Sequence, residues 1–186
     1  MKYIFLLCFA ILFSGCSSYI ALPKDTSRAA HNRIKKQVKD GLIVAAEDYS
    51  EYRRARRYFY RDLLDIGYIP IYICIGNQSE SEFTVRKEKI TLILEDGTQA
   101  IAADVKEVID NAGGNDALDQ DYSQKAFRDS HVRKEDNLFG FLFFKAPTLK
   151  KSFSLKSATL QVLADKKAEP GQQGETLKFL VSIDTD

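Results

Sequence analysis

The sequence has few of the residues that build metal centres and catalytic triads. Histidine occurs only twice in 186 residues, as His31 and His131, and the chain has no HxxxH or CxxC motif that would give a zinc-type spacing. A G-x-S-x-G nucleophile motif is also missing, and a serine triad would need a histidine. We therefore expect no metal site, no cofactor and no catalytic residue of these classes.

The apolar run at the N-terminus is too short to cross a membrane as a helix. It covers the 11 residues 3–13, about 16 Å of helix, or roughly half of a bilayer's hydrocarbon core. Lys2 precedes the run, and the small residues Ser14 and Gly15 follow it before Cys16. This order of charged, apolar and small residues is typical of a secretory signal, so residues 1–15 are predicted to be a signal peptide.

The end of this segment, Phe13-Ser14-Gly15-Cys16, resembles the lipobox of bacterial lipoproteins, with Phe13 where the family usually has leucine. The resemblance implies that Cys16 becomes the N-terminus and carries a thioether-linked diacyl lipid, with an acylated amine in many bacteria. Two or three acyl chains give stable anchoring where one does not. In this family Ser17, in place of an aspartate, implies the outer membrane, facing the periplasm. The alternative is an ordinary signal peptide with an incidental cysteine.

Cysteine is scarce, and the three residues stand in different settings. Cys8 would leave with the signal and Cys16 would carry lipid, so Cys74 would remain alone and no intramolecular disulfide could form. Cys74 lies in the apolar stretch "YIPIYICIGN". A reactive cysteine needs a basic or helix-N-terminal setting that this stretch does not offer. We expect Cys74 to be buried as a small hydrophobic residue.

Net charge is nearly absent. Removal of residues 1–15 takes away one base, Lys2, and leaves 26 basic residues against 26 acidic ones. No net positive field would attract nucleic acid, which is also not expected outside the cell membrane. The expected partners are the membrane, through the lipid on Cys16, and an envelope protein or a glycan.

The rest of the chain divides into a lipidated tether, residues 16–32, and one domain, residues 33–186. Alternating apolar residues predict one bent strand or two short ones around Ile34–Val44 and a strand through Ile90, Leu92 and Leu94. Further strands are predicted within 68–76, 98–102, 138–147, 152–155, 157–166 and 175–184. About seven strands without a βαβ rhythm favour a mainly β protein, an antiparallel β-sandwich of immunoglobulin-like type. The stretches "GLIVAAEDYS", "IPIYICIGNQS" and "GFLFF" resemble uncharacterised bacterial lipoproteins with immunoglobulin-like domains, a resemblance that implies no functional residue.

One helix, residues 51–66, is predicted inside this β pattern. Apolar residues recur at three- and four-residue steps, and Gly67 is expected to end the helix. The apolar face comprises Tyr52, Ala55, Phe59, Leu63 and Ile66. The other face holds a possible binding ridge of Arg53, Arg54, Arg57 and Arg61, which could meet lipid phosphates, an acidic partner or a glycan. The alternative is a solvated face with local pairing to Glu51 and Asp62.

The segment "LFGFLFF", residues 138–144, is apolar on both faces of a predicted strand. Phe139, Phe141 and Phe143 share one face, and the other residues share the opposite face. Such a strand must be covered on both sides. One cover is the core of the sandwich, and the predicted helix 51–66 or a partner would supply the other.

Residues 103–137 form a polar excursion from the sheet, with short helical stretches near 105–110 and 123–128. Within it, "GGNDALDQD" is predicted to be a solvated acidic loop, and "DSHVRKED" a surface loop. The first functional hypothesis is a non-catalytic binding or scaffolding module. The second is an envelope hydrolase that uses paired carboxylates, for which the candidates are Asp116, Asp119, Asp121 and Glu135.

Overall fold

The computed structural model describes residues 21–24, 29–33, 35–146, 155, 157–168 and 173–184. The predicted signal peptide, Cys16 and Ser17 lie outside these residues. Within the described ranges the chain forms nine strands, three α-helices and one 3-10 helix. In chain order these are η1 (Ala30–Asn32), β1 (Lys36–Lys39), β2 (Leu42–Asp48), α2 (Tyr52–Phe59), β3 (Tyr68–Asn77), β4 (Phe83–Leu94), β5 (Gln99–Ile101), α3 (Val105–Asn111), α4 (Asp116–Lys125), β6 (Ser130–Val132), β7 (Asn137–Lys145), β8 (Ser157–Lys166) and β9 (Glu175–Asp184).

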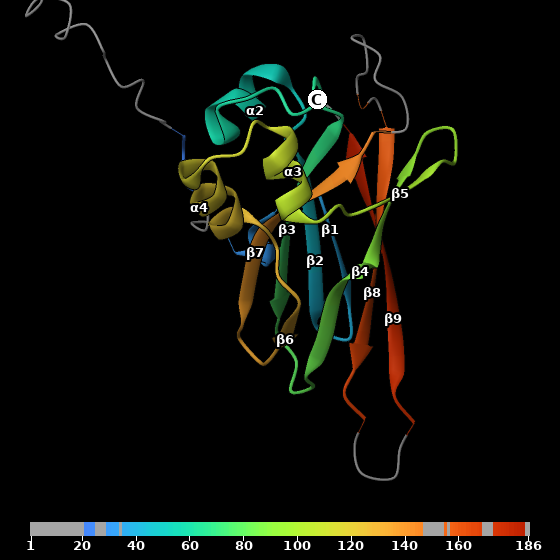
Figure 1. Ribbon diagram of the computed structural model, residues 1–186. Coiled ribbons are helices and arrows are strands. Elements are labelled where there is room, and N and C mark those ends of the chain that lie inside the picture. The colour runs from blue at the N-terminus through green and yellow to red at the C-terminus, as the bar shows by residue number, and fades with distance from the viewer. Residues whose placement is uncertain are drawn as a thin grey trace, which may run out of the picture.

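The strands form two antiparallel sheets that face each other (Figure 1). One sheet has the order β1-β2-β3-β7, and the other has the order β5-β4-β8-β9, with β6 also paired to β4. The predicted antiparallel β-sandwich is confirmed. The helices α3 and α4 lie in the chain between β5 and β6.

The main core lies between the sheets and follows from the alternation of side chains along each strand. In β3, Ile69, Ile71, Ile73 and Ile75 all point into this core and are fully buried. The same core receives apolar residues from β4, β8 and β9 of the opposite sheet. The period of two that was visible in the sequence therefore assigns the inner face of β3 correctly.

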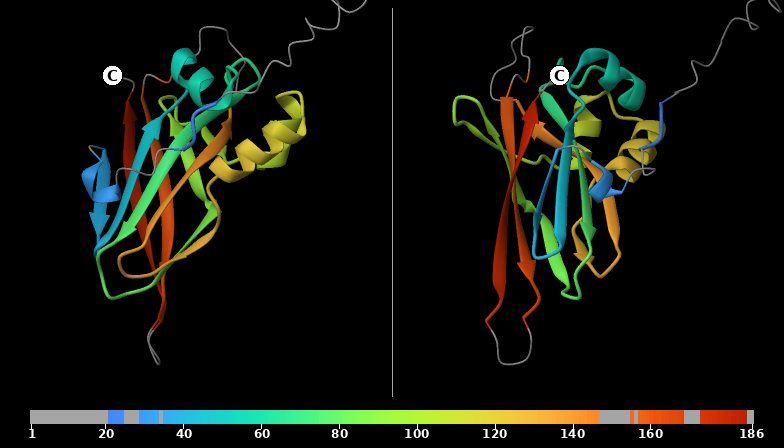
Figure 2. Two further views of the ribbon diagram at one scale, coloured as in Figure 1. Left: turned by 90° about the vertical axis from the view of Figure 1, so that its left-hand side faces the viewer. Right: turned by 180° about the vertical axis from the view of Figure 1, so that it is seen from behind.

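A second core lies on the outer face of the β3–β7 pair. Tyr68 and Tyr72 of β3 and Phe141 and Phe143 of β7 point outward and are buried by the helices. Figure 2 shows α2, α3 and α4 on this side of the sheet, away from β8 and β9. The predicted helix is thus only part of the cover. The rest comes from α3 and α4, which belong to the segment predicted to be an excursion from the sheet.

The helix α2 ends at Phe59, not at Ile66 as predicted. Tyr60 adopts a left-handed conformation with φ of 57°, and residues 61–67 form turns. The carbonyls that would continue the helix are bonded elsewhere: Phe59 O accepts a hydrogen bond from the Tyr122 hydroxyl at 2.9 Å, and Tyr58 O accepts one from Lys125 Nζ. Donors from α4 therefore replace the next helical turn.

Lys125 makes this contact as a buried cation. Its side chain is 2% exposed and forms an ion pair of 2.6 Å with Asp121. Burial lowers the pKa of Lys125, and the pairing with Asp121 opposes that shift. The pair lies within α4 and stabilises the charge of Lys125, and the hydrogen bond from Lys125 Nζ to Tyr58 O is what joins α4 to the end of α2.

The acidic stretch predicted to be a loop is in fact the helix α4. Asn115 caps its N-terminus, because Asn115 Oδ1 accepts a hydrogen bond from Leu118 N at 2.9 Å. Asp116 and Asp119 lie in the first turn, where carboxylates interact favourably with the helix dipole. Leu118 is buried in the second core, so one apolar contact per turn suffices to hold a helix of otherwise polar sequence.

The described part of the predicted tether lies against the sandwich. Ala30 of η1 is fully buried with Ile43, Ala45 and Cys74 on a further part of the outer face. Cys74 is 1% exposed, which confirms its predicted burial. None of the described helices is long and apolar enough to span a bilayer.

Replacing Phe59 with alanine tests the second core. Phe59 is fully buried, with ring centroids 4.8 Å from Phe141 and 5.5 Å from Tyr122. Its removal is expected to lower the free energy of unfolding by about 3–5 kcal/mol, measured by urea denaturation. The matched variant Tyr52→Ala, on the exposed side of α2, should change it by about 0.5 kcal/mol or less. Equal effects of the two variants would contradict this assignment of the faces.

Candidate functional site

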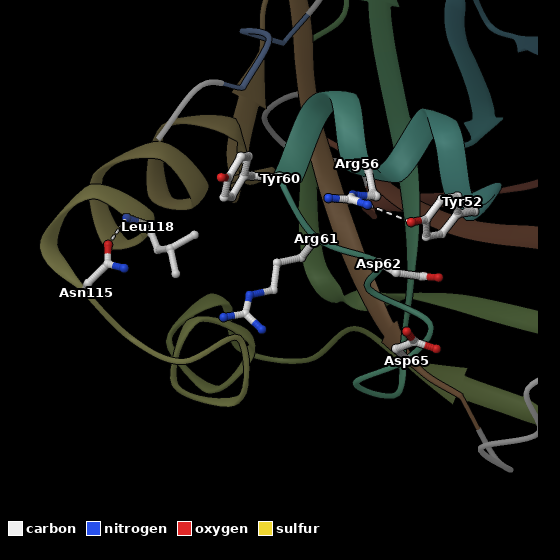
Figure 3. A pocket seen from close by; sticks show the side chains of 8 residues that line it. All are labelled: Tyr52, Arg56, Tyr60, Arg61, Asp62, Asp65, Asn115 and Leu118. Atoms are coloured by element: carbon white, nitrogen blue, oxygen red, sulfur yellow. Dashed lines mark hydrogen bonds between the residues drawn. The ribbon is translucent and has the colours of Figure 1, made fainter. Parts of the chain in front are cut away.

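A cavity of about 390 Å³ lies between α2, the turns that follow it and the start of α4 (Figure 3). It opens beside the arginine-rich helix that the sequence singled out. Two cationic, two anionic and two phenolic side chains line it together with an amide and one aliphatic group. These residues are Tyr52, Arg56, Tyr60, Arg61, Asp62, Asp65, Asn115 and Leu118.

One wall of the cavity is formed by α2. Tyr52 and Arg56 are one helical turn apart, and Arg56 Nη1 donates a hydrogen bond to the Tyr52 hydroxyl at 2.6 Å. The Arg56 guanidinium also lies 5.5 Å from the centre of the Tyr52 ring. The hydrogen bond from Arg56 to Tyr52 raises the pKa of Arg56, so this group stays cationic. Tyr52 and Tyr60 both expose a large part of their rings to solvent.

The facing wall is acidic and comes from the turns after α2. Asp62 Oδ1 accepts a hydrogen bond from Leu64 N at 3.0 Å, which fixes the carboxylate. Burial raises the pKa of Asp62, and the neighbouring charge of Asp65 raises it further. Arg56 acts in the opposite direction. The cavity therefore has mixed charge and is suited to polar or ionic groups, not to an apolar ligand.

Arg61 reaches across the cavity toward the link between α3 and α4. A Cβ atom at Gly113 would lie 3.1 Å from Arg61 Nη2, and Gly113 has a positive φ of 96°. Glycine at this position gives the guanidinium room and permits the turn. Arg61 lies beyond the end of α2, so it is not part of a helical ridge as the sequence suggested.

The predicted ridge separates into residues with different settings. Arg53 and Arg57 lie on the exposed side of α2. Arg54 turns back onto the sandwich, with its guanidinium 3.7 Å from the centre of the Tyr49 ring. Arg54 Nη1 donates to Asp48 O at 2.8 Å, and Arg54 Nη2 pairs with Glu47 at 3.1 Å. Arg54 is thus bound to the protein itself, whereas the other three arginines face solvent.

Sequence reasoning missed Arg56. At about 100° per residue, positions 52, 53, 56, 57 and 60 lie within about 140° of the helix circumference, so Arg56 falls among the other exposed residues. The helical spacing from Tyr52 to Arg56 was the signal that could have identified it. Together with Arg61 these residues form what we call the arginine–tyrosine surface: Tyr52, Arg53, Arg56, Arg57, Tyr60 and Arg61.

The carboxylates considered for hydrolysis do not come together in a cavity. Asp116, Asp119 and Glu135 are exposed, and Asp121 is paired with Lys125. None of the four lines the cavity beside α2, nor a second one of about 340 Å³ that lies against β7. In the described part of the chain, no group of three His, Cys, Asp or Glu side chains is placed to hold a metal ion.

Alanine variants of adjacent arginines test the different settings on α2. Arg54→Ala removes a cation–π contact and two hydrogen bonds, so we expect a loss of about 1–2 kcal/mol in the free energy of unfolding. Arg53→Ala should be neutral or slightly stabilising, because a cation in the first helical turn opposes the helix dipole. Urea denaturation of both variants measures the difference. Similar losses would show that Arg54 does not hold α2 to the sheet.

No protein-family model matches the sequence, and no curated protein is significantly similar to it. Among solved structures, the fold is distantly similar to ycdA of Bacillus subtilis, a candidate lipoprotein, with 14% identity, 78% of this chain covered and a TM-score of 0.39. The match spans only 38% of ycdA. A second structure, yjhA of Bacillus subtilis, has 8% identity, a coverage of 70% of this chain and 78% of yjhA, and a TM-score of 0.41. Likenesses this distant carry no argument about function.

Proposed function

We propose that the chain is a lipid-anchored protein of the bacterial envelope and that its β-sandwich is a non-catalytic binding module. The lipobox-like Phe13-Ser14-Gly15-Cys16 supports lipidation at Cys16, and Ser17 favours the outer membrane with the domain in the periplasm. The arginine–tyrosine surface is the binding face in this proposal. A non-catalytic role is favoured over a hydrolase in this proposal because none of the four candidate carboxylates lines either cavity.

The binding role is supported by the exposure and the lack of ion pairs of three arginines. Arg53, Arg57 and Arg61 are exposed and make no ion pair with any residue that the structure describes. Other surface cations do pair, as Lys89 does with Asp165 and Lys134 with Glu80. Unpaired guanidiniums beside exposed phenol rings favour a ligand with phosphate or carboxylate groups.

The N-terminus of α2 is capped without the side chains of these arginines. The N-cap is Glu51, whose carboxylate accepts hydrogen bonds from Arg53 N and Arg54 N at 3.1 Å each. Arg53 lies in the first turn, where a positive side chain is unfavourable beside the helix dipole. A residue that costs helix stability and forms no ion pair within the described part of the chain is better explained by a ligand than by folding.

Metabolic labelling with a fatty-acid analogue tests the anchor. The wild-type chain should incorporate the label, and Cys16→Ser should abolish both the label and lipoprotein-type processing. Cys74→Ser is the matched control and should be labelled as the wild type is, because Cys74 is buried in the sandwich. Normal processing of Cys16→Ser without lipid would identify an ordinary secreted protein and overturn the proposal.

A further inference from the structure

The first residues that the structure describes contact α2. Leu22 N donates a hydrogen bond to Arg57 O at 2.8 Å, and Lys24 Nζ donates one to Phe139 O at 3.2 Å. Residues 22–24 are therefore held between α2 and β7. Leu22 is six residues after Cys16, which carries the lipid in the proposed function.

Covalent geometry limits how far α2 can lie from the anchor. Six residues span at most about 21 Å, whatever conformation they adopt. The ten residues of β3 alone extend over about 33 Å. Figures 1 and 2 show α2 at the end of the sandwich where β3 begins, opposite the turn between β3 and β4. A lipid on Cys16 would thus hold the α2 end of the domain close to the bilayer.

The charge of this end matches that of an anionic membrane. Four arginines of the arginine–tyrosine surface lie there, against the carboxylates of Asp62 and Asp65 in the cavity wall and of Glu51 at the N-cap of α2. A basic side chain near an anionic leaflet is attracted to it, and this attraction decays over about 8 Å at physiological salt. The lipid anchor would keep the arginines within this short range of the headgroups. Their binding to the membrane would then be an intramolecular step.

We propose that the arginine–tyrosine surface docks the sandwich on the anionic phospholipid headgroups of the membrane that holds its lipid anchor. The proposal rests on lipidation of Cys16 in the proposed function. Arg53, Arg57 and Arg61 bind lipid phosphates, and the exposed rings of Tyr52 and Tyr60 lie at the headgroup level, where tyrosine is favoured. The domain is then held in one orientation, with the turn between β3 and β4 directed away from the bilayer.

Modification of arginines by phenylglyoxal tests the docking without a reporter group. The full-length, lipidated protein is reconstituted into vesicles of phosphatidylcholine alone or with added phosphatidylglycerol, and modification is quantified for each arginine by mass spectrometry. With phosphatidylglycerol, modification of Arg53, Arg56, Arg57 and Arg61 should be several-fold slower, and high salt should reverse this protection. The exposed Arg86 and Arg133 should react equally in both kinds of vesicle.

Two charge variants distinguish an effect of the arginine–tyrosine surface from an effect of the protein's total charge. In Arg53→Gln/Arg57→Gln/Arg61→Gln, the remaining Arg56 should lose its protection in phosphatidylglycerol vesicles. In the matched variant Arg86→Gln/Arg133→Gln/Lys178→Gln, which removes the same charge from exposed positions elsewhere, Arg56 should stay protected. Unchanged urea midpoints would show that both variants are folded.

The outcomes distinguish the two proposals. A protein that lacks lipid on Cys16 by mass and does not float with vesicles contradicts the proposed function, and the docking that rests on it. A lipidated, floating protein whose arginines react equally in both vesicles contradicts the docking alone. Protection that appears only when an envelope protein extract is added would assign the surface to a protein partner and also overturn membrane docking.

Discussion

Much of this structure depends on one constraint, which is that β7 is apolar on both faces. Leu142 and Phe144 fill the core between the sheets, while Phe141 and Phe143 point out of the sandwich. An antiparallel sheet can leave one face in water, but four large side chains in a row on both faces cannot be left half exposed without a large hydrophobic penalty. The three helices pack on this side of the molecule, where they remove those rings from water.

The cover determines where the basic residues point. Ala55 and Phe59 are the buried residues of α2, so the positions on the opposite side of this short helix must face solvent. Contacts from α4 then fix where α2 ends, since Tyr122 and Lys125 bond to its last carbonyls. The burial of the apolar rings therefore also sets the orientation of the arginine–tyrosine surface.

Sequence patterns predicted the elements whose signals are local. The strict alternation in β3 and the burial of Cys74 could be read from neighbouring residues alone. The end of α2 could not, because the donors that stop it come from α4, more than sixty residues later in the chain. Of α4, only the last turn falls within a predicted helical stretch, near 123–128. Its first turns were missed because their pattern is mostly polar and their few apolar residues are recognisable only against the outer face of β7.

The candidate site was predicted in part for the same reason. Helical spacing brought Arg53 and Arg57 together correctly, but it could not show that Arg54 stacks on Tyr49 or that Arg61 lies past the helix end. The cavity itself needs Asn115 and Leu118 from α4, so no local pattern reveals it. The lipobox-like motif lies outside the described residues and stays a prediction from sequence.

Hydrogen exchange in Tyr122→Phe tests most directly whether α4 holds α2 in place. The substitution removes only the hydroxyl that bonds to Phe59 O and keeps the ring packed against Phe59 and Phe143. We predict faster amide exchange in residues 55–60, with unchanged protection of β3, because the sandwich does not depend on this bond. Unchanged exchange in α2, or equal loss of protection in α2 and β3, would contradict the account.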